Sequence, residues 1–260
     1  MQALEDHPPG IHEHQLREFF GEGGFAAPAG AAQQDPVTIM LFVNRCGSTL
    51  LGEYLRATGR FSGFGEPLSH ELVMQRCRTH GMRSLAAYLQ WLLDNIRQPG
   101  TQFGMKLSLD QVEMLCRAGL IPGMLSRVNW VYVYRRDILG QAISFSIAAQ
   151  TGAWKSSDRH TLDDVVFDYA DIRARVEEIA LRYHQISRFI ALNGISAYQL
   201  AYEEFLEDPS RHSLAIARAC GEHAESVNTE RLSMQRQRSA LNQRLREQFL
   251  AARERETRAD

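Results

Sequence analysis

The sequence predicts an α/β protein whose central sheet is mostly parallel and is flanked by helices. Four short runs rich in β-branched and aromatic residues recur along the chain: VTIMLFV (37–43), FGMKLSL (103–109), NWVYVYR (129–135) and SAYQLAY (196–202). Longer amphipathic segments separate these runs, which have the length and apolar character of buried strands. Strands that alternate with helices favour a parallel sheet, because two parallel strands need a crossover connection.

The helix between the first two strand runs is marked at both ends. The run LLGEYLRATG follows Ser48 and Thr49, and either hydroxyl can cap the start of a helix. Gly59 suits the left-handed position just after the helix ends.

Three later helices are predicted from periodicity. Residues 84–97 place leucines and a tyrosine on one face and stop before a Pro-Gly pair. Residues 162–193 carry a longer helical pattern of apolar residues. From Gln235 onward the chain has many charges and few large apolar residues, which predicts a solvated helix that frays at RERETRAD.

Length and composition indicate one domain. A chain of 260 residues with 44% hydrophobic residues can bury one large core. Residues 21–36 are rich in Gly, Ala and Pro and end at a proline, which is typical of a loose connection. We therefore expect a flexible lead-in over residues 1–36 and a single domain with a helical tail over residues 37–260.

Charge, hydropathy and cysteine usage argue against several classes of protein. A formal net charge of −2 gives no basic field for nucleic acid. No stretch reaches the roughly 18 apolar residues of a membrane span, and the first thirty residues contain no signal-peptide core. The four cysteines form no CxxC pair, which favours free thiols and no metal site. The expectation is a cytoplasmic protein.

The segment after the first strand run has the outline of an anion-binding loop. Its sequence is Asn44, Arg45, Cys46, Gly47, Ser48 and Thr49, without the GxxxxGK[ST] pattern of a triphosphate loop. Backbone N–H groups at the helix start, the two hydroxyls and the Arg45 guanidinium would attract a local anion. The alternative is that Ser48 or Thr49 only caps the helix and Arg45 is a surface charge.

A second anion site is predicted after the third strand run. Arg135 and Arg136 emerge at the carboxyl edge, where open α/β sheets bind ligands. Ser144 follows about two helical turns later. The alternative is that Arg135 pairs with Asp137 and that Ser144 lies on the helix surface. Two separated sites suit a nucleotide with a 5′-phosphosulfate and a 3′-phosphate better than they suit ATP.

Five blocks of the chain, in order, resemble the small bacterial carbohydrate sulfotransferases of the trehalose 2-sulfotransferase type and, more distantly, the Nod-factor sulfotransferases. They are NRCGSTLL, FGEP, FGMKLSLDQ, RRDILGQAISFSIAAQTGAW and QRQRSALNQ. The resemblance runs from about Val37 to about Arg246. It implies a P-loop-like three-layer α/β fold and the donor 3′-phosphoadenosine-5′-phosphosulfate (PAPS), which leaves 3′-phosphoadenosine-5′-phosphate (PAP) as the product.

The resemblance also implies donor-binding residues. The 5′-phosphosulfate site maps onto Arg45, Cys46, Gly47, Ser48 and Thr49, where Cys46 replaces the usual serine or threonine and is expected to bind through its backbone N–H. The 3′-phosphate site maps onto Arg135 (or Arg136) and Ser144. Arg238, in QRQRS, matches a segment that closes over the donor.

Sulfuryl transfer to an alcohol needs donors around the sulfuryl group and a base for the hydroxyl proton. Lys106 in FGMKLSL can face the sulfuryl group or can lie at the strand edge in solvent. Glu66 matches the family's GEP context and is the first candidate for the base. The family's second glutamate is Ser69 here, so His70 and then Glu71 remain alternatives. Trp154 is either a stacking or a core residue.

The resulting hypothesis is a PAPS-dependent sulfotransferase without a metal, which acts on a carbohydrate or glycolipid hydroxyl. A homodimer is an open expectation, and the acceptor itself is not readable from the sequence. The alternatives are a P-loop kinase that uses ATP with Mg²⁺ and a nucleotide-binding protein without catalysis. The kinase is disfavoured because the chain lacks the lysine-containing loop and because the strand NWVYVY ends in arginines.

Overall fold

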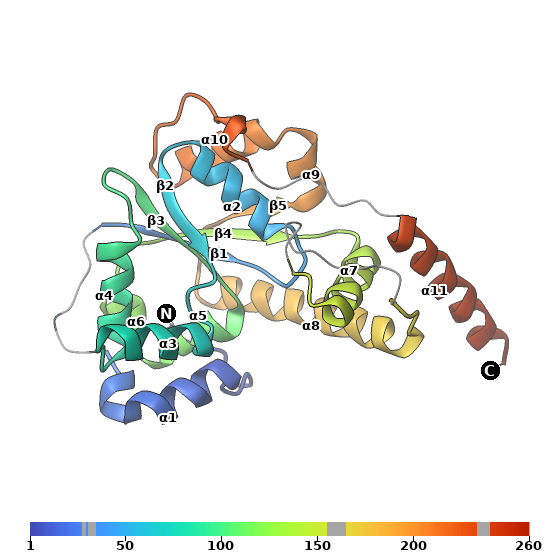
Figure 1. The fold of residues 1–260 in the computed structure, drawn as a ribbon, viewed down its shortest axis with the longest axis horizontal. Coiled ribbons are helices and arrows are strands. Elements are labelled where there is room, and N and C mark those ends of the chain that lie inside the picture. The colour runs from blue at the N-terminus through green and yellow to red at the C-terminus, as the bar shows by residue number, and fades with distance from the viewer. Residues whose placement is uncertain (28–29, 31–34, 155–164, 233–239, 260) are drawn as a thin grey trace.

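The computed structural model describes residues 1–27, 30, 35–154, 165–232 and 240–259. Its centre is a five-stranded parallel sheet with the strand order β2-β3-β1-β4-β5 (Figure 1). The strands are β1 (Val37–Leu41), β2 (Phe61–Gly65), β3 (Gln102–Leu107), β4 (Val128–Tyr134) and β5 (Ala197–Ala201). The predicted α/β class with a parallel sheet is confirmed.

The four predicted strand runs correspond to β1, β3, β4 and β5, and the fifth strand, β2, was not predicted. Its sequence, FSGFG, is short and glycine-rich and gives no apolar run. Gly63 has a φ of 85° and lies where the pairing with β3 shifts register. A Cβ on Gly63 would lie 2.4 Å from the carbonyl oxygen of Gly104, so only glycine fits this close approach.

Alternate residues of β1 face two different cores. Val37, Ile39 and Leu41 belong to one apolar cluster, whereas Met40 and Phe42, which directly follows the strand, belong to another. This period-2 alternation places successive side chains on opposite faces of the sheet, and both faces are apolar because helices cover both. All five residues are 6% exposed or less.

Helices of two groups form the outer layers (Figure 1). The first core packs against α1 (Ile11–Phe25), α3 (His70–His80), α4 (Leu85–Asn95), α5 (Leu109–Arg117), α6 (Leu120–Gly123) and α8 (Tyr169–Leu192). The second packs against α2 (Ser48–Ala57), α9 (Tyr202–Glu207) and α10 (Pro209–Ala219). A 3₁₀ turn spans Thr229–Arg231. Among the described helices, none combines the length and apolar character needed to cross a bilayer.

The N-terminal segment is part of the core, so the expectation of ordered structure only from Val37 onward is wrong. Leu4, Leu16 and Phe25 are 5%, 0% and 1% exposed and pack in the same cluster as β1. The backbone N–H of Leu4 donates to the buried carboxylate of Glu113 at 2.7 Å. Glycines and prolines mark the join before β1, but the apolar residues that precede it are needed to cover the sheet.

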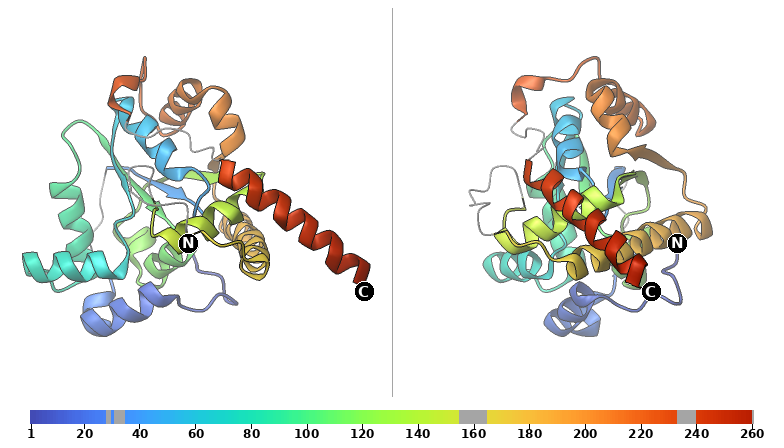
Figure 2. Two further views of the ribbon diagram at one scale, coloured as in Figure 1. Left: turned by 45° about the vertical axis from the view of Figure 1, so that its right-hand side comes forward. Right: turned by 90° about the vertical axis from the view of Figure 1, so that its right-hand side faces the viewer.

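A third apolar cluster lies among α7 (Ile138–Thr151), α8 and α11 (Ala240–Ala259). The helix predicted for residues 162–193 begins at Tyr169, because the Asp168 side chain caps it. The predicted tail helix is present, but its inner face is not solvated: Leu241, Leu245 and Phe249 are buried. Figure 2 shows α11 extending outward from the body beside α7 and α8.

Candidate functional site

The loop between β1 and α2 lies at a switch point of the sheet. β1 is the central strand, with β3 and β2 on one side and β4 and β5 on the other. The carboxyl ends of β3 and β4 therefore flank the loop that leaves β1. Open α/β sheets bind their ligands at such a crevice.

The backbone of this loop has two residues with left-handed φ values and leads into a helix start that no side chain caps. Arg45 and Gly47 have φ values of 67° and 94°, both in the left-handed region. Gly47 is the N-cap of α2 and no side chain caps this helix start, so the alternative reading of Ser48 or Thr49 as caps is wrong. An N-terminus without a capping side chain leaves its partial positive charge available to a ligand.

Cys46 is buried, and its backbone N–H is used within the loop itself. Its side chain is 0% exposed, and burial raises the pKa of the thiol. Its backbone N–H, which we expected to face the anion, donates instead to the carbonyl oxygen of Val43 at 3.2 Å. Cys46 therefore shapes the turn, and the neutral thiol is unsuited to act as a nucleophile.

Tyr202, at the carboxyl end of β5, packs directly on the loop. A Cβ on Gly47 would lie 2.2 Å from Cδ2 of this ring, so the position requires glycine for space as well as for its φ value. The guanidinium carbon of Arg135 lies 5.4 Å from the ring centroid. Tyr202 thus links the loop to the end of β4, a role that the sequence analysis did not assign.

Lys106 joins the loop to the first candidate for the base. Its Nζ donates to Thr49 Oγ1 and to Glu66 Oε1, both at 2.8 Å. The Lys106 side chain is 4% exposed and Glu66 is 50% exposed. The alternative of a lysine in solvent is therefore wrong, because the ammonium is buried beside the loop and the carboxylate opens to solvent.

Arg45 and Ser144 are in direct contact, although the prediction gave them to two separate phosphate sites. Arg45 Nε donates to Ser144 Oγ at 2.9 Å, and NH1 donates to the carbonyl oxygen of Trp154 at 2.6 Å. Ser144 therefore faces the loop and is not a helix-surface serine. Trp154 is 48% exposed, so its reading as a core residue is wrong, and its ring meets Phe145 edge-on.

The two arginines after β4 have different surroundings. Arg136 is 55% exposed and forms an ion pair with Glu204. The Arg135 side chain is 22% exposed, and its closest carboxylate oxygens, on Asp137 and Glu203, lie 3.7 and 3.9 Å away. Among the described residues, Arg135 Nε is buried without a hydrogen-bond partner. Arg136 is held by a close ion pair, whereas Arg135 has no carboxylate oxygen within hydrogen-bond distance among the described residues, so Arg135 is the better candidate to receive a ligand.

A hydrogen-bonded chain fixes the two strand ends together. The backbone N–H of Arg135 donates to the Tyr183 hydroxyl at 2.9 Å, and this hydroxyl donates to Gln141 Oε1 at 2.6 Å. Gln141 Nε2 donates in turn to the carbonyl oxygen of Asn44 at 2.7 Å. Burial raises the pKa of Tyr183, so the phenol remains a donor near neutral pH. This series of hydrogen bonds connects the end of β4, through α8 and α7, to the loop after β1.

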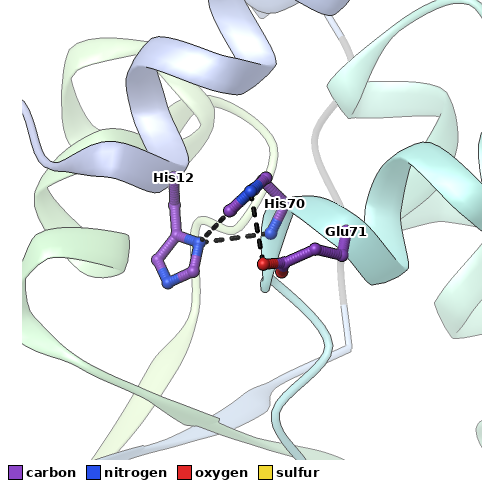
Figure 3. A group of neighbouring side chains, drawn as sticks. All are labelled: His12, His70 and Glu71. Carbon is purple, nitrogen blue, oxygen red and sulfur yellow. Dashed lines mark hydrogen bonds and ion pairs between the residues drawn. The ribbon is translucent and has the colours of Figure 1, made fainter.

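The other two candidates for the base, His70 and Glu71, lie at the start of α3 and face α1. His70 Nδ1 lies 3.0 Å from Nδ1 of His12, and His70 Nε2 lies 3.3 Å from Glu71 Oε1 (Figure 3). Both residues line a cavity of about 480 Å³ between α1 and α3. Their contacts thus differ from those of Glu66, which meets Lys106.

Arg238 lies outside the described residues. Among the others, Tyr202, Tyr183 and Gln141 were missed by the sequence analysis. Tyr202 ends a predicted strand run, so its place at the carboxyl edge could have drawn attention to it. Nothing in the local sequence marks Tyr183 or Gln141, because their partners lie 48 and 97 positions away.

Comparisons with known proteins identify the fold and the family. A crystal structure of a sulfotransferase from Alicyclobacillus acidocaldarius matches with a TM-score of 0.52 and 16% identity, over 84% of this chain and 93% of that one. At this identity the match shows the shared fold. A search of curated proteins finds no match. The family model for the Stf0 sulphotransferases matches residues 38–250. It confirms the resemblance seen in the sequence, and the chain accordingly belongs to the Stf0 sulphotransferase family.

Proposed function

We propose that this sulfotransferase takes the sulfuryl group from PAPS and transfers it to a hydroxyl of a carbohydrate or glycolipid. The observation that carries the proposal is the contact of Lys106 with both Thr49 and Glu66 at 2.8 Å. This single ammonium lies between an anion-binding loop and an acid half-open to solvent. The two groups that sulfuryl transfer requires, an anion site and a base, are therefore adjacent.

The residues at the carboxyl edge fit a donor with two anionic ends. The start of α2, Lys106 and Arg45 suit the 5′-phosphosulfate, because each presents positive charge or N–H groups around one loop. The Arg135 guanidinium, whose side chain is 22% exposed and which has no close carboxylate among the described residues, suits the 3′-phosphate. Tyr202 lies between the loop and Arg135 and holds these two regions next to each other.

In the proposed reaction the acceptor oxygen attacks sulfur as the bond from sulfur to the leaving phosphate oxygen breaks. Glu66 takes the hydroxyl proton, and PAP leaves with the bonding electrons. Lys106 and the α2 N–H groups stabilise the negative charge that grows on the sulfuryl and leaving oxygens. Lys106 also fixes the Glu66 carboxylate through Oε1, and Oε2 has no polar partner among the described residues.

Donor binding separates this function from an ATP-dependent kinase. PAP at roughly 100 times its Kd should add about 2.7 kcal/mol to the free energy of unfolding, whereas ATP with Mg²⁺ should add much less. Differential scanning fluorimetry measures both shifts. Arg135→Met should weaken the binding of PAP but not that of adenosine 5′-phosphosulfate, which lacks the 3′-phosphate. A larger shift with ATP and Mg²⁺ would contradict the proposal.

The base can be assigned by comparing three variants in a transfer assay. With labelled sulfate from PAPS and an extract of small molecules from the source cells as acceptors, Glu66→Gln should lose about 100- to 10,000-fold in rate. His70→Ala and Glu71→Gln should each stay within about threefold of wild type, since their contacts lie at α1.

PAP binding is the control for the Glu66 variant, because glutamine retains an oxygen for the Lys106 ammonium. Glu66→Gln should keep the wild-type PAP shift in the fluorimetry experiment. Loss of transfer in His70→Ala or Glu71→Gln, with Glu66→Gln active, would move the base to α3.

A further inference from the structure

Two histidines and a glutamate from separate helices meet at the junction of α1 and α3 (Figure 3). His12 is in the first turn of α1, and His70 and Glu71 open α3, 58 positions later. One ligand atom from each of the three residues lies within 4.8 Å of the other two. These side chains belong neither to the anion loop nor to the Lys106 cluster.

The two imidazoles approach each other through their Nδ1 atoms, close to the Glu71 carboxylate. A contact of 3.0 Å between His12 Nδ1 and His70 Nδ1 requires that one of these nitrogens carries no proton. His12 Nδ1 also accepts the backbone N–H of His70 at 3.2 Å, so the lone pair belongs to His12. In a tetrahedral zinc site with Zn–N distances of about 2.0–2.1 Å, two ligating nitrogens lie roughly 3.3 Å apart. The observed separation needs a change of only a few tenths of an ångström.

We propose that His12, His70 and Glu71 bind one divalent transition-metal ion, for which zinc is the best match, and that this ion joins α1 to α3. Two imidazoles and one carboxylate are a donor set that zinc takes, whereas Mg²⁺ and Ca²⁺ prefer oxygen ligands alone. The inference is independent of the proposed sulfuryl transfer.

Burial and access also favour this site. The side chain of His70 is 18% exposed, which fixes its ring, and that of Glu71 is 71% exposed, which leaves the carboxylate room to turn toward an ion. The cavity of about 480 Å³ beside them gives an ion a path from solvent and room for a water ligand. Gln15, one turn after His12, lines the same cavity.

Charge around the site makes the glutamate necessary. The first turns of α1 and α3 both present helix N-termini, whose partial positive charge opposes a cation, and Arg78 also lines the cavity. Glu71 is the carboxylate of this cluster and lies 3.3 Å from Nε2 of His70. Glu71→Gln should therefore weaken metal binding even though the amide oxygen remains a ligand.

The test is zinc titration of the full chain, free of any affinity tag and treated with a chelator, by isothermal calorimetry. One site per chain is expected, with a rise in melting temperature on zinc addition. His12→Ala and His70→Ala should each lower the affinity by more than about tenfold. His14→Ala is the matched control, because His14 is exposed on the same helix, and it should leave the affinity unchanged.

The absorption spectrum of bound cobalt distinguishes this site from a site formed by the cysteines. Co²⁺ bound here should give d–d absorption without a thiolate charge-transfer band, because the ligands are nitrogen and oxygen. If a histidine variant fails to fold, imidazole ¹⁵N spectra of the wild type decide instead: zinc should shift Nδ1 of His12 and His70 and not that of His14. Absence of zinc binding, a thiolate band, or an affinity unchanged in both histidine variants would overturn the proposal.

Discussion

Replacing Lys106 with methionine should lower kcat by about 100- to 1,000-fold, the usual effect of removing one charged or hydrogen-bonding group that stabilises a transition state. The ammonium of Lys106 contacts both the anion loop and Glu66, so its loss removes positive charge where negative charge develops. Methionine has a similar length and no charge. Steady-state transfer assays with saturating PAPS measure the change.

The loss should appear in catalysis and not in folding. Glu66 is 50% exposed, so water solvates its carboxylate once the partner is gone, and the free energy of unfolding should change by no more than about 1 kcal/mol. Arg97→Met is the control, because it removes one positive charge beside the amino end of β3, where Arg97 pairs with Asp35. Equal activity losses in both variants would point to the overall field and contradict a specific role of Lys106.

Replacing Gly47 with alanine should abolish the stabilisation by PAP and should destabilise the fold by at least about 2 kcal/mol. Two costs add at this position. The left-handed φ of 94° costs an L-residue roughly 1–2 kcal/mol, and the new Cβ would lie 2.2 Å from Cδ2 of Tyr202. The ring must move, and it then no longer lies between the loop and Arg135. Urea unfolding with and without PAP measures both effects.

Gly59→Ala is the matched control for the cost of placing alanine at a left-handed φ. Gly59 follows the same helix, α2, at a φ of 73°, and a Cβ placed there meets no atom within 4 Å. Its variant should bear only the conformational cost and keep the response to PAP. The clash itself can be tested by placing Gly47→Ala in a Tyr202→Ala background, where its cost should fall toward that of Gly59→Ala. Equal costs for Gly47→Ala and Gly59→Ala in the native background would contradict the close approach.

Local patterns predicted the parts of the fold whose causes are local. The strand runs of β1, β3, β4 and β5 are mostly apolar along their length, so the covered faces of the sheet can be read from them. Gly47 and Gly59 were also recognisable, because a glycine after a strand or just past a helix commonly supplies a left-handed backbone. β2 was missed because FSGFG is held by its pairing to β3 and not by its own propensity.

The candidate site was predicted less completely, since its contacts join distant positions. Arg45 and Ser144 are 99 positions apart in the sequence and were assigned to separate sites, although their side chains are in contact. Cys46 was expected to donate its N–H to a ligand, and only the observed turn shows that Val43 takes it. Tyr202 reaches Gly47 from the end of the edge strand β5. Pairings of this kind depend on strand order, which one sequence does not specify.

The packing of α1 shows that the unit that folds is longer than the stretch that the family model matches. The family model begins at residue 38, yet Leu16 and Phe25 fill the same core as β1 and are 0% and 1% exposed. A protein trimmed to the matched stretch would open this face of the sheet to water and leave Glu113 without the N–H of Leu4. For expression and crystallisation, the boundary should therefore follow the packed core and not the stretch that the family model matches.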